Sequence, residues 1–211
     1  PKGPQTRWLD VGCGTGVLLD SFKAIADKVG VETEALCVER GKSKGLNIHQ
    51  TGLTWDFSSL GKFDLITLCD VIEHVEHDAE AIAAVKESLN PGGIVLVTVP
   101  ALMSLWSAHD VVNHHFRRYT RSQLKAWCSD GRWAVQRSSY FCSFLFPTVW
   151  LARKLKTRKH GLELENAKHD LKFGLKPVDA VLEMIFSAEK PLLQFVDLPV
   201  GSSLILVAKK L

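Results

Sequence analysis

The sequence predicts an α/β fold with a seven-stranded, mostly parallel, doubly wound sheet whose last strand is antiparallel. Over the first two-thirds of the 211 residues, short apolar runs alternate with segments of helical periodicity. This alternation is typical of a parallel sheet with helices on both faces. Residues 141–199 then separate the last two strands, and this stretch is too long for a bare loop. We therefore expect a single domain, residues 1–211, with a helical cap inserted at 141–199.

The expected elements follow one another along the chain. We expect strands at Arg7–Val11, Glu34–Val38, Leu46–His49, Phe63–Cys69, Ile94–Val99, Trp133–Tyr140 and Ser203–Ala208. We expect helices at Gly16–Lys28, Ala79–Leu89, Arg121–Ser129 and, in the insertion, near Pro147–Thr157, Leu162–Phe173 and Pro177–Phe186. Asp78 is a candidate N-cap, Thr120 and Gln123 form a candidate capping box, and Asn90–Gly93 is a helix-ending turn.

The composition is that of a globular protein: 46% of the residues are hydrophobic and 23% are charged. A net charge of +3 is too small to indicate nucleic-acid binding by itself. The five cysteines contain no Cys-x-x-Cys pair, which favours reduced thiols over disulfides or a zinc site. There is no signal peptide and no apolar run long enough to span a membrane, so we expect a cytoplasmic protein. The oligomeric state stays open.

The most informative segment is Leu9–Gly16, in which an apolar run ends in Asp10 and three glycines follow at alternate positions. This pattern is typical of a buried strand that turns sharply into a helix, where free backbone N–H groups face a ligand. Dinucleotide-binding turns have the spacing Gly-x-Gly-x-x-Gly, and a Walker A loop needs a lysine that is absent here. The segment therefore disfavours a phosphate cradle and an NAD(P)-dependent oxidoreductase.

The same segment resembles motif I of the class I S-adenosylmethionine-dependent methyltransferases. Phe63–Val75, with the sequence FDLITLCDVIEHV, resembles motif IV of the small-molecule branch of that family, which includes the ubiquinone- and menaquinone-pathway methyltransferases. Leu89–Gly93 matches the family's turn before the fifth strand. The resemblance implies a Rossmann-like fold, S-adenosylmethionine as methyl donor and S-adenosylhomocysteine as product. It is dense over residues 7–101 and looser beyond them.

The resemblance also assigns cofactor-binding residues. It places Glu39, at the end of the expected second strand, on the ribose hydroxyls, and Cys69 and Asp70 near the methionine end of the cofactor. The acid that many relatives place near adenine is missing, so we expect adenine to contact backbone groups of Thr51–Thr54 and the side chain of Leu53 or Trp55. The predicted cofactor-binding set is Asp10, Gly12, Cys13, Gly14, Gly16, Glu39, Arg40, Leu53, Cys69 and Asp70.

The acceptor site is expected in the segment Trp106–Thr120, which is dense in groups that donate, accept or titrate. His109 and His115 are the candidate catalytic bases, because a neutral imidazole can take a proton from a hydroxyl. The candidate acceptor contacts are His114, Arg117, Arg118 and Tyr119. Alternatively, the last three form a structural lid over the cofactor. The His-x₄-His-His spacing also suits a metal, but no acid cluster accompanies it, and we predict no metal site.

An aromatic-rich apolar block at 140–152 directly precedes a basic cluster at 153–160. This pairing suits a membrane interface, so we predict peripheral membrane contact through residues 140–160 and a hydrophobic or lipid-linked small-molecule acceptor. The alternative is a core strand followed by a solvated basic helix. Nucleic acid is disfavoured because the basic residues are local. A non-catalytic S-adenosylmethionine-binding scaffold is the alternative function, and the intact Asp10, Gly12, Gly14 and Glu39 count against it.

Overall fold

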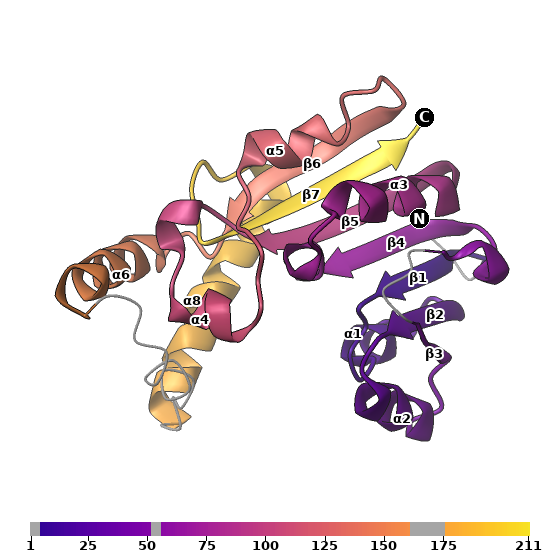
Figure 1. Cartoon of the computed structure of the whole chain (residues 1–211), viewed down its shortest axis with the longest axis horizontal. Coiled ribbons are helices and arrows are strands. Elements are labelled where there is room, and N and C mark those ends of the chain that lie inside the picture. The colour runs from indigo at the N-terminus through magenta and orange to yellow at the C-terminus, as the bar shows by residue number, and fades with distance from the viewer. Residues whose placement is uncertain (1–4, 52–55, 161–175) are drawn as a thin grey trace.

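The computed structural model describes residues 5–51, 56–160 and 176–211. Its centre is one seven-stranded sheet with the strand order β3-β2-β1-β4-β5-β7-β6 (Figure 1). The first five strands of the chain pair in parallel, and β7 pairs antiparallel with both β5 and β6. The predicted fold class is therefore confirmed.

The elements have the following bounds. The strands are β1 (Arg7–Val11), β2 (Asp27–Glu32), β3 (Ile48–Gln50), β4 (Phe63–Cys69), β5 (Leu89–Pro100), β6 (Trp133–Phe141) and β7 (Ser203–Lys210). The α-helices are α1 (Val17–Ser21), α2 (Ala35–Ser43), α3 (Asp78–Ser88), α4 (Ala108–Val112), α5 (Arg121–Ala126), α6 (Phe146–His160) and α8 (Lys176–Phe195). Three 3-10 turns, η1 (Ser58–Leu60), η2 (Ile72–His74) and η3 (Met103–Leu105), lie between them.

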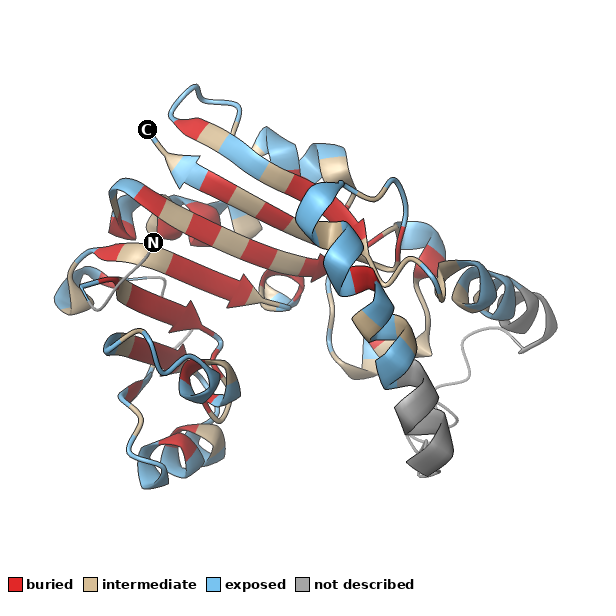
Figure 2. Cartoon of the chain, turned by 180° about the vertical axis from the view of Figure 1, so that it is seen from behind, coloured by how far each residue is buried: buried red, intermediate tan, exposed pale blue. Residues whose placement is uncertain are grey.

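The core follows the central strands. Ile66 and Leu68 on β4 and Val99 on β5 are fully buried, and Figure 2 shows the buried residues running along the strands while the helices are largely exposed. Burying each such aliphatic side chain stabilises the fold by about 1.5–3 kcal/mol. The sheet is therefore a rigid base for the loops at its carboxyl ends.

The predicted second strand is wrong. Ala35–Val38 forms the start of α2, and the strand is Asp27–Glu32, which pairs with β1 from Asp27 opposite Arg7 to Val31 opposite Val11. The helix predicted to run to Lys28 ends at Ser21. Leu36 is 62% exposed, so the apolar run that suggested a buried strand lies on a helix that buries only one face.

The fifth strand starts earlier than predicted. Phe63 pairs with Leu89 and Leu65 pairs with Ile94, so residues 90–93 bulge out opposite Asp64 alone. The side chain of Asn90 donates to Asp64 Oδ1 at 2.9 Å, which holds this bulge. The expected turn is thus present as an irregularity within β5.

The insertion contains α6 and α8, in the places where helices near Pro147–Thr157 and Pro177–Phe186 were predicted; the helix predicted at Leu162–Phe173 lies outside the described residues. Figures 1 and 2 show α3 and α5 on one face of the sheet and α8 crossing the other. In Figure 1, α4 and α6 lie beyond the carboxyl ends of β4 and β5. Within the described ranges, no helix has the length and apolar character needed to cross a membrane.

Candidate active site

The turn between β1 and α1 is packed on one side and open on the other. The N–H groups of Gly12 and Cys13 both donate to the carbonyl of Val31, at 2.9 and 3.1 Å. A Cβ added at Gly16 would lie 2.4 Å from Leu46 Cδ1, whereas a Cβ at Gly14 would meet no described heavy atom within 4 Å. A ligand can therefore approach the backbone closely at Gly14.

Glu32, the last residue of β2, fixes its carboxylate against this turn. Its Oε2 accepts the Gly14 N–H at 2.8 Å, and its Oε1 accepts the N–H groups of Thr33 and Glu34 at 2.7 and 3.0 Å. Burial raises the pKa of Glu32, but these backbone donors together lower it below its usual value. An ionised carboxylate thus stands beside the open side of the turn, where hydroxyl groups could donate to it.

Glu39 does not occupy this position, and its placement at a strand end is wrong. Glu39 and Arg40 are exposed on α2, because the strand ends seven residues earlier, at Glu32. The predicted adenine contact, Leu53, lies outside the described residues. The sequence did carry a signal for Glu32. The short apolar segment Val29–Val31 is followed directly by this acid, just as the apolar pair Trp8 and Leu9 of β1 is followed by Asp10.

Asp10 is buried in β1 next to its register partner on β4. The indole N–H of Trp8 donates to Thr67 Oγ1 at 2.8 Å, and this hydroxyl donates to Asp10 Oδ1 at 2.5 Å. Burial raises the pKa of Asp10 to about 6, and the nearby charge of Glu32 adds to the increase, while the Thr67 hydrogen bond opposes it. Asp10 and Glu32 together make this edge of the sheet acidic.

Cys69 ends β4 at the same edge, and Asp70 follows it directly. Asp70 has a left-handed φ of 54°, and its N–H donates to Thr98 O at 3.0 Å. Desolvation raises the pKa of the Asp70 carboxyl, while the nearby rings of His115 and His74 favour its ionised form. Burial also raises the pKa of Cys69, to about 11, so its thiol stays protonated.

Asp110 organises the segment that follows β5. Its side chain is fully buried, and it accepts from Arg118 twice, Nε to Oδ1 at 2.7 Å and Nη2 to Oδ2 at 3.1 Å. Oδ2 also accepts the N–H of Ser107 at 2.8 Å, and Oδ1 lies 3.0 Å from His115 Nδ1. The spacing Ser107-x-x-Asp110 is that of a capping box, and this sequence signal was missed.

The basic and phenolic side chains of this segment are bonded within the fold. Arg118 is 6% exposed and Tyr119 is 2% exposed. The Tyr119 hydroxyl donates to Asp78 Oδ2 at 2.9 Å, and Arg117 Nη1 lies 3.3 Å from Asp78 Oδ1. The fold itself uses the side chains of Arg118 and Tyr119, and their predicted contact with the acceptor stays a prediction.

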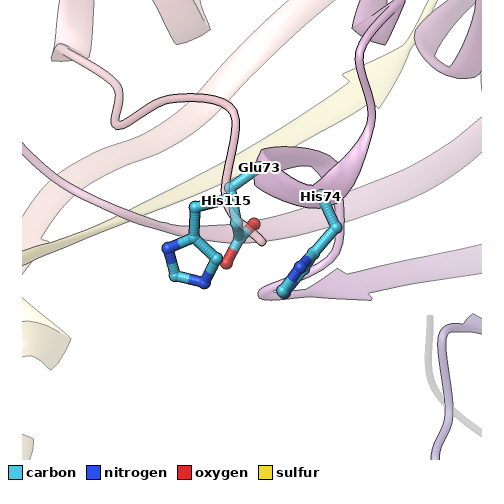
Figure 3. A group of neighbouring side chains, drawn as sticks. All are labelled: Glu73, His74 and His115. Atoms are coloured by element: carbon cyan, nitrogen blue, oxygen red, sulfur yellow. The ribbon is translucent and has the colours of Figure 1, made fainter. Parts of the chain in front are cut away.

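The predicted histidines separate into two groups. The His109 ring nitrogen Nε2 is bonded to Asn113 Nδ2 at 2.9 Å, and burial lowers the pKa of His109. His114 is exposed with a φ of 56°. His115 instead reaches the turn η2, where it meets Glu73 and His74 (Figure 3). Only His115 of the three thus joins a cluster at the carboxyl edge of β4.

That cluster is close and partly buried. The rings of His74 and His115 meet edge to face with centroids 4.6 Å apart. The N–H of Phe116 donates to the carbonyl of Glu73 at 2.7 Å, which fixes the two segments together. Burial raises the pKa of the Glu73 carboxyl to about 8.

The strand order and the acidic carboxyl edge with its glycine turn define a Rossmann-like domain of the class I methyltransferase type. Residues 1–134 match the family described as "Methyltransferase domain", and the chain belongs to that family. Among curated proteins, it is 29% identical over 151 residues to a ubiquinone biosynthesis O-methyltransferase of Nitrosococcus oceani, which covers 59% of this chain and 62% of that protein. The corresponding protein of Glaesserella parasuis is 31% identical over 146 residues, with 57% and 62% covered.

The chain therefore spans about three fifths of the length of the curated relatives it matches. Among solved structures, a SAM-dependent methyltransferase from Archaeoglobus fulgidus superposes with a TM-score of 0.61 over 100% of this chain and 89% of that chain. At 16% identity, that likeness shows a shared fold.

The resemblance of the glycine turn implies S-adenosylmethionine as the cofactor, and the residues present fit it. The open side of Gly14 leaves room for a ligand against the backbone. Glu32 offers acceptors for ribose hydroxyls, and it would hold that part of the cofactor. The carboxylates of Asp10, Glu32 and Asp70 suit a ligand that carries a positive sulfonium.

Proposed function

We propose that this chain transfers the methyl group of S-adenosylmethionine to an oxygen of a hydrophobic small molecule. The observation that carries the proposal is the contact between Glu32 and Gly14, which sets an ionised carboxylate beside an open glycine turn. When bound, the cofactor supplies an electrophilic methyl group and leaves as S-adenosylhomocysteine. The protein then has to orient the acceptor and accept one proton from its hydroxyl.

His115 is the proposed proton acceptor. Burial raises the pKa of Asp110, but the hydrogen bonds and charge of Arg118 hold it below its usual value, so Asp110 stays ionised. An ionised Asp110 can accept a hydrogen bond from a protonated His115 Nδ1, which lies 3.0 Å away. In that tautomer the Nε2 of His115 carries no proton and can take one. His109 is less suited, because its Nε2 is already bonded to Asn113.

Two observations support an oxygen acceptor on a hydrophobic molecule. The curated relatives are named as O-methyltransferases of ubiquinone biosynthesis. Large apolar side chains are also exposed on the inserted helices, among them Leu151 on α6 and Phe195 on α8, which are 52% and 81% exposed. Such a surface suits the capture of an apolar acceptor at a membrane, with the protein attached peripherally. No observation favours the scaffold or oxidoreductase alternatives.

Calorimetric titration with S-adenosylmethionine and S-adenosylhomocysteine tests the cofactor role of Glu32. We expect Glu32→Gln to weaken binding of both compounds by about 1–3 kcal/mol, because charge-assisted hydrogen bonds to the ribose are lost. Glu39→Gln is the matched control, since this acid is exposed on α2 and should bind normally. Equal affinities for the two variants would refute the assignment.

The transfer itself is tested with methyl-labelled S-adenosylmethionine and a cell extract divided into a lipid and an aqueous fraction. We expect label to enter a compound of the lipid fraction as a methyl ether. Label that appears only in the aqueous fraction contradicts a hydrophobic acceptor, and no label in either fraction contradicts methyl transfer.

A further inference from the structure

Glu73 carries a buried oxygen that its protein neighbours leave unsatisfied. The residue is 1% exposed, and its Oε2 has no hydrogen-bond partner among the described residues. Leaving such a group without a partner costs about 1–3 kcal/mol, so an oxygen of this kind calls for an explanation. An unpaired, buried carboxyl oxygen is what a bound cation would satisfy.

Two imidazoles face this carboxyl. One ligand atom each from Glu73, His74 and His115 can be chosen so that all three lie within 4.8 Å of one another, and Figure 3 shows the Glu73 carboxyl close to both rings. Three ligands around an ion in a tetrahedral site, each bound at about 2.0–2.2 Å, lie about 3.3 Å apart. Side-chain adjustments of about an ångström would therefore complete the coordination, and His74 is an exposed residue whose ring already lies against that of His115.

The carboxylate beside His115 Nδ1 is the partner that metal-binding histidines usually have on the ring nitrogen that does not bind the metal. Asp110 lies 3.0 Å from His115 Nδ1 and is itself held by the bidentate contact with Arg118. A carboxylate on one ring nitrogen fixes the tautomer and orients the other nitrogen toward a metal. The carboxyl of Asp70, close enough to both imidazoles to interact electrostatically, adds negative charge.

We propose that Glu73, His74 and His115 bind one divalent transition-metal ion, preferentially Zn²⁺. Two imidazoles and one carboxylate suit zinc and its neighbours in the first transition row, whereas Mg²⁺ and Ca²⁺ favour sites made only of oxygen. Three protein ligands leave a coordination position open for a further molecule. This set differs from the His109, His114 and His115 grouping considered from the sequence, since only His115 is shared.

The role of the ion rests on the proposed function, although its binding does not. A bound ion would use His115 Nε2, so the proposed role of His115 as proton acceptor would apply only to the metal-free chain. The ion would lower the pKa of a coordinated acceptor hydroxyl, and the proton of that hydroxyl would pass to water before the oxygen received the methyl group. The open position at the acidic edge of the sheet is where such a hydroxyl would bind.

Metal binding is measured directly on the full chain after dialysis against a chelator. Calorimetry with Zn²⁺ and the visible spectrum with Co²⁺ should each give one ion per chain, and Mg²⁺ should give no signal. A cobalt spectrum without a thiolate charge-transfer band assigns the ion to nitrogen and oxygen ligands, and such a band would assign it to the cysteines and overturn the proposal.

Variants separate the cluster from adventitious sites. Glu73→Gln and His74→Ala should each weaken Zn²⁺ binding at least about 10-fold, while His49→Ala, an exposed histidine on β3, should bind as the parent does. His74 is exposed, so its variant tests the site even if Glu73→Gln disturbs folding. Unchanged affinity in His74→Ala overturns the proposal. Binding of S-adenosylhomocysteine, measured in the same samples, separates the metal proposal from the proposed function. If the chain binds S-adenosylhomocysteine but not Zn²⁺, only the metal proposal is rejected.

Discussion

At the scale of one residue, Asp10 shows that a side chain kept for the site can lower the stability of the fold. The folded state holds the Asp10 proton with a pKa of about 6, against 3.8 for the unperturbed group. Since each unit corresponds to about 1.4 kcal/mol, the ionised form destabilises the ligand-free protein by about 3 kcal/mol at neutral pH. A buried carboxylate retained at such a cost is typical of a functional position.

Replacing Asp10 with Asn should therefore stabilise the ligand-free protein. The amide oxygen can still accept the Thr67 hydroxyl, and the charge is gone. The folded pKa is raised, so the wild-type protein loses stability relative to Asp10→Asn as the pH rises from about 4 to about 6. Urea unfolding of both proteins at several pH values measures this difference. Parallel stability curves across that range would show that Asp10 titrates normally.

The site's acids show what sequence reasoning at residue scale can find. As predicted, Asp10 lies near the end of β1, Gly14 in the turn after it and Asp70 directly after β4, because motif spacing fixes each of them within one chain segment. From the sequence we chose Glu39 as the strand-end acid and missed Glu32, for which we now propose the ribose role, because the choice depends on where the strand ends. The buried hydrogen bond that Arg118 donates to Asp110 joins residues eight positions apart across an irregular segment, and no periodicity predicts such a contact.

At the scale of elements, the turn from β1 to α1 contains two glycines with different roles: one leaves room for a ligand, and the other is required by packing. Gly14 and Gly16 both have left-handed φ angles, 55° and 74°. An alanine at either position costs about 1–2 kcal/mol of backbone strain. At Gly16 the new methyl group would also meet Leu46 Cδ1 at 2.4 Å, whereas at Gly14 it would enter open space.

Gly14→Ala should therefore fold with a loss of about 1–2 kcal/mol and still lose most S-adenosylmethionine affinity, since the methyl group fills the ligand's side of the turn. Gly16→Ala should lose about 1–3 kcal/mol more stability through overpacking. Urea unfolding and cofactor calorimetry on both variants measure the two effects. Normal cofactor affinity in a folded Gly14→Ala protein would place the ligand elsewhere.

The elements that local chemistry specifies were predicted well. The capping box of Thr120 and Gln123 opens α5 as expected, and β4 has its predicted bounds. The strand β2 was missed because it contains Gly30 and charged residues. Gly30 is required there by packing: a Cβ would lie 2.5 Å from the sulfur of Cys13. That contact comes from a different segment of the chain, so the local sequence pattern of β2 does not reveal it.

At the scale of the whole molecule, the site joins two parts of the chain. The strands β1, β2 and β4 supply the acidic edge, and the segment after β5 supplies His115 and its partners. The hydrogen bond from the Phe116 N–H to the Glu73 carbonyl joins the two parts. The sequence placed both segments near the carboxyl edge by topology, but the meeting of Glu73 with His115 depends on long-range packing.

The inserted helix α6 extends this edge outward. It docks on η3 through a bond from the Arg153 guanidinium to the carbonyl of Leu105. Trp150 and Leu151 are 36% and 52% exposed, and the ammonium group of Lys154 lies 4.6 Å from the centre of the Trp150 ring. Aromatic and apolar side chains beside a cation suit an interface between water and anionic lipid headgroups.

Co-sedimentation with vesicles containing anionic lipid tests this surface on the full chain. We expect binding that falls with added salt, because part of the attraction is electrostatic. The double variant Trp150→Ser with Leu151→Ser should lower the partition coefficient at least about 10-fold, since each side chain contributes roughly 1 kcal/mol or more of apolar burial. Val17→Ser with Leu36→Ser is the matched control, because these residues are exposed on α1 and α2, away from the insertion. Equal loss in both double variants would indicate general hydrophobic adsorption, and binding unaffected by either would place the lipid contact outside α6.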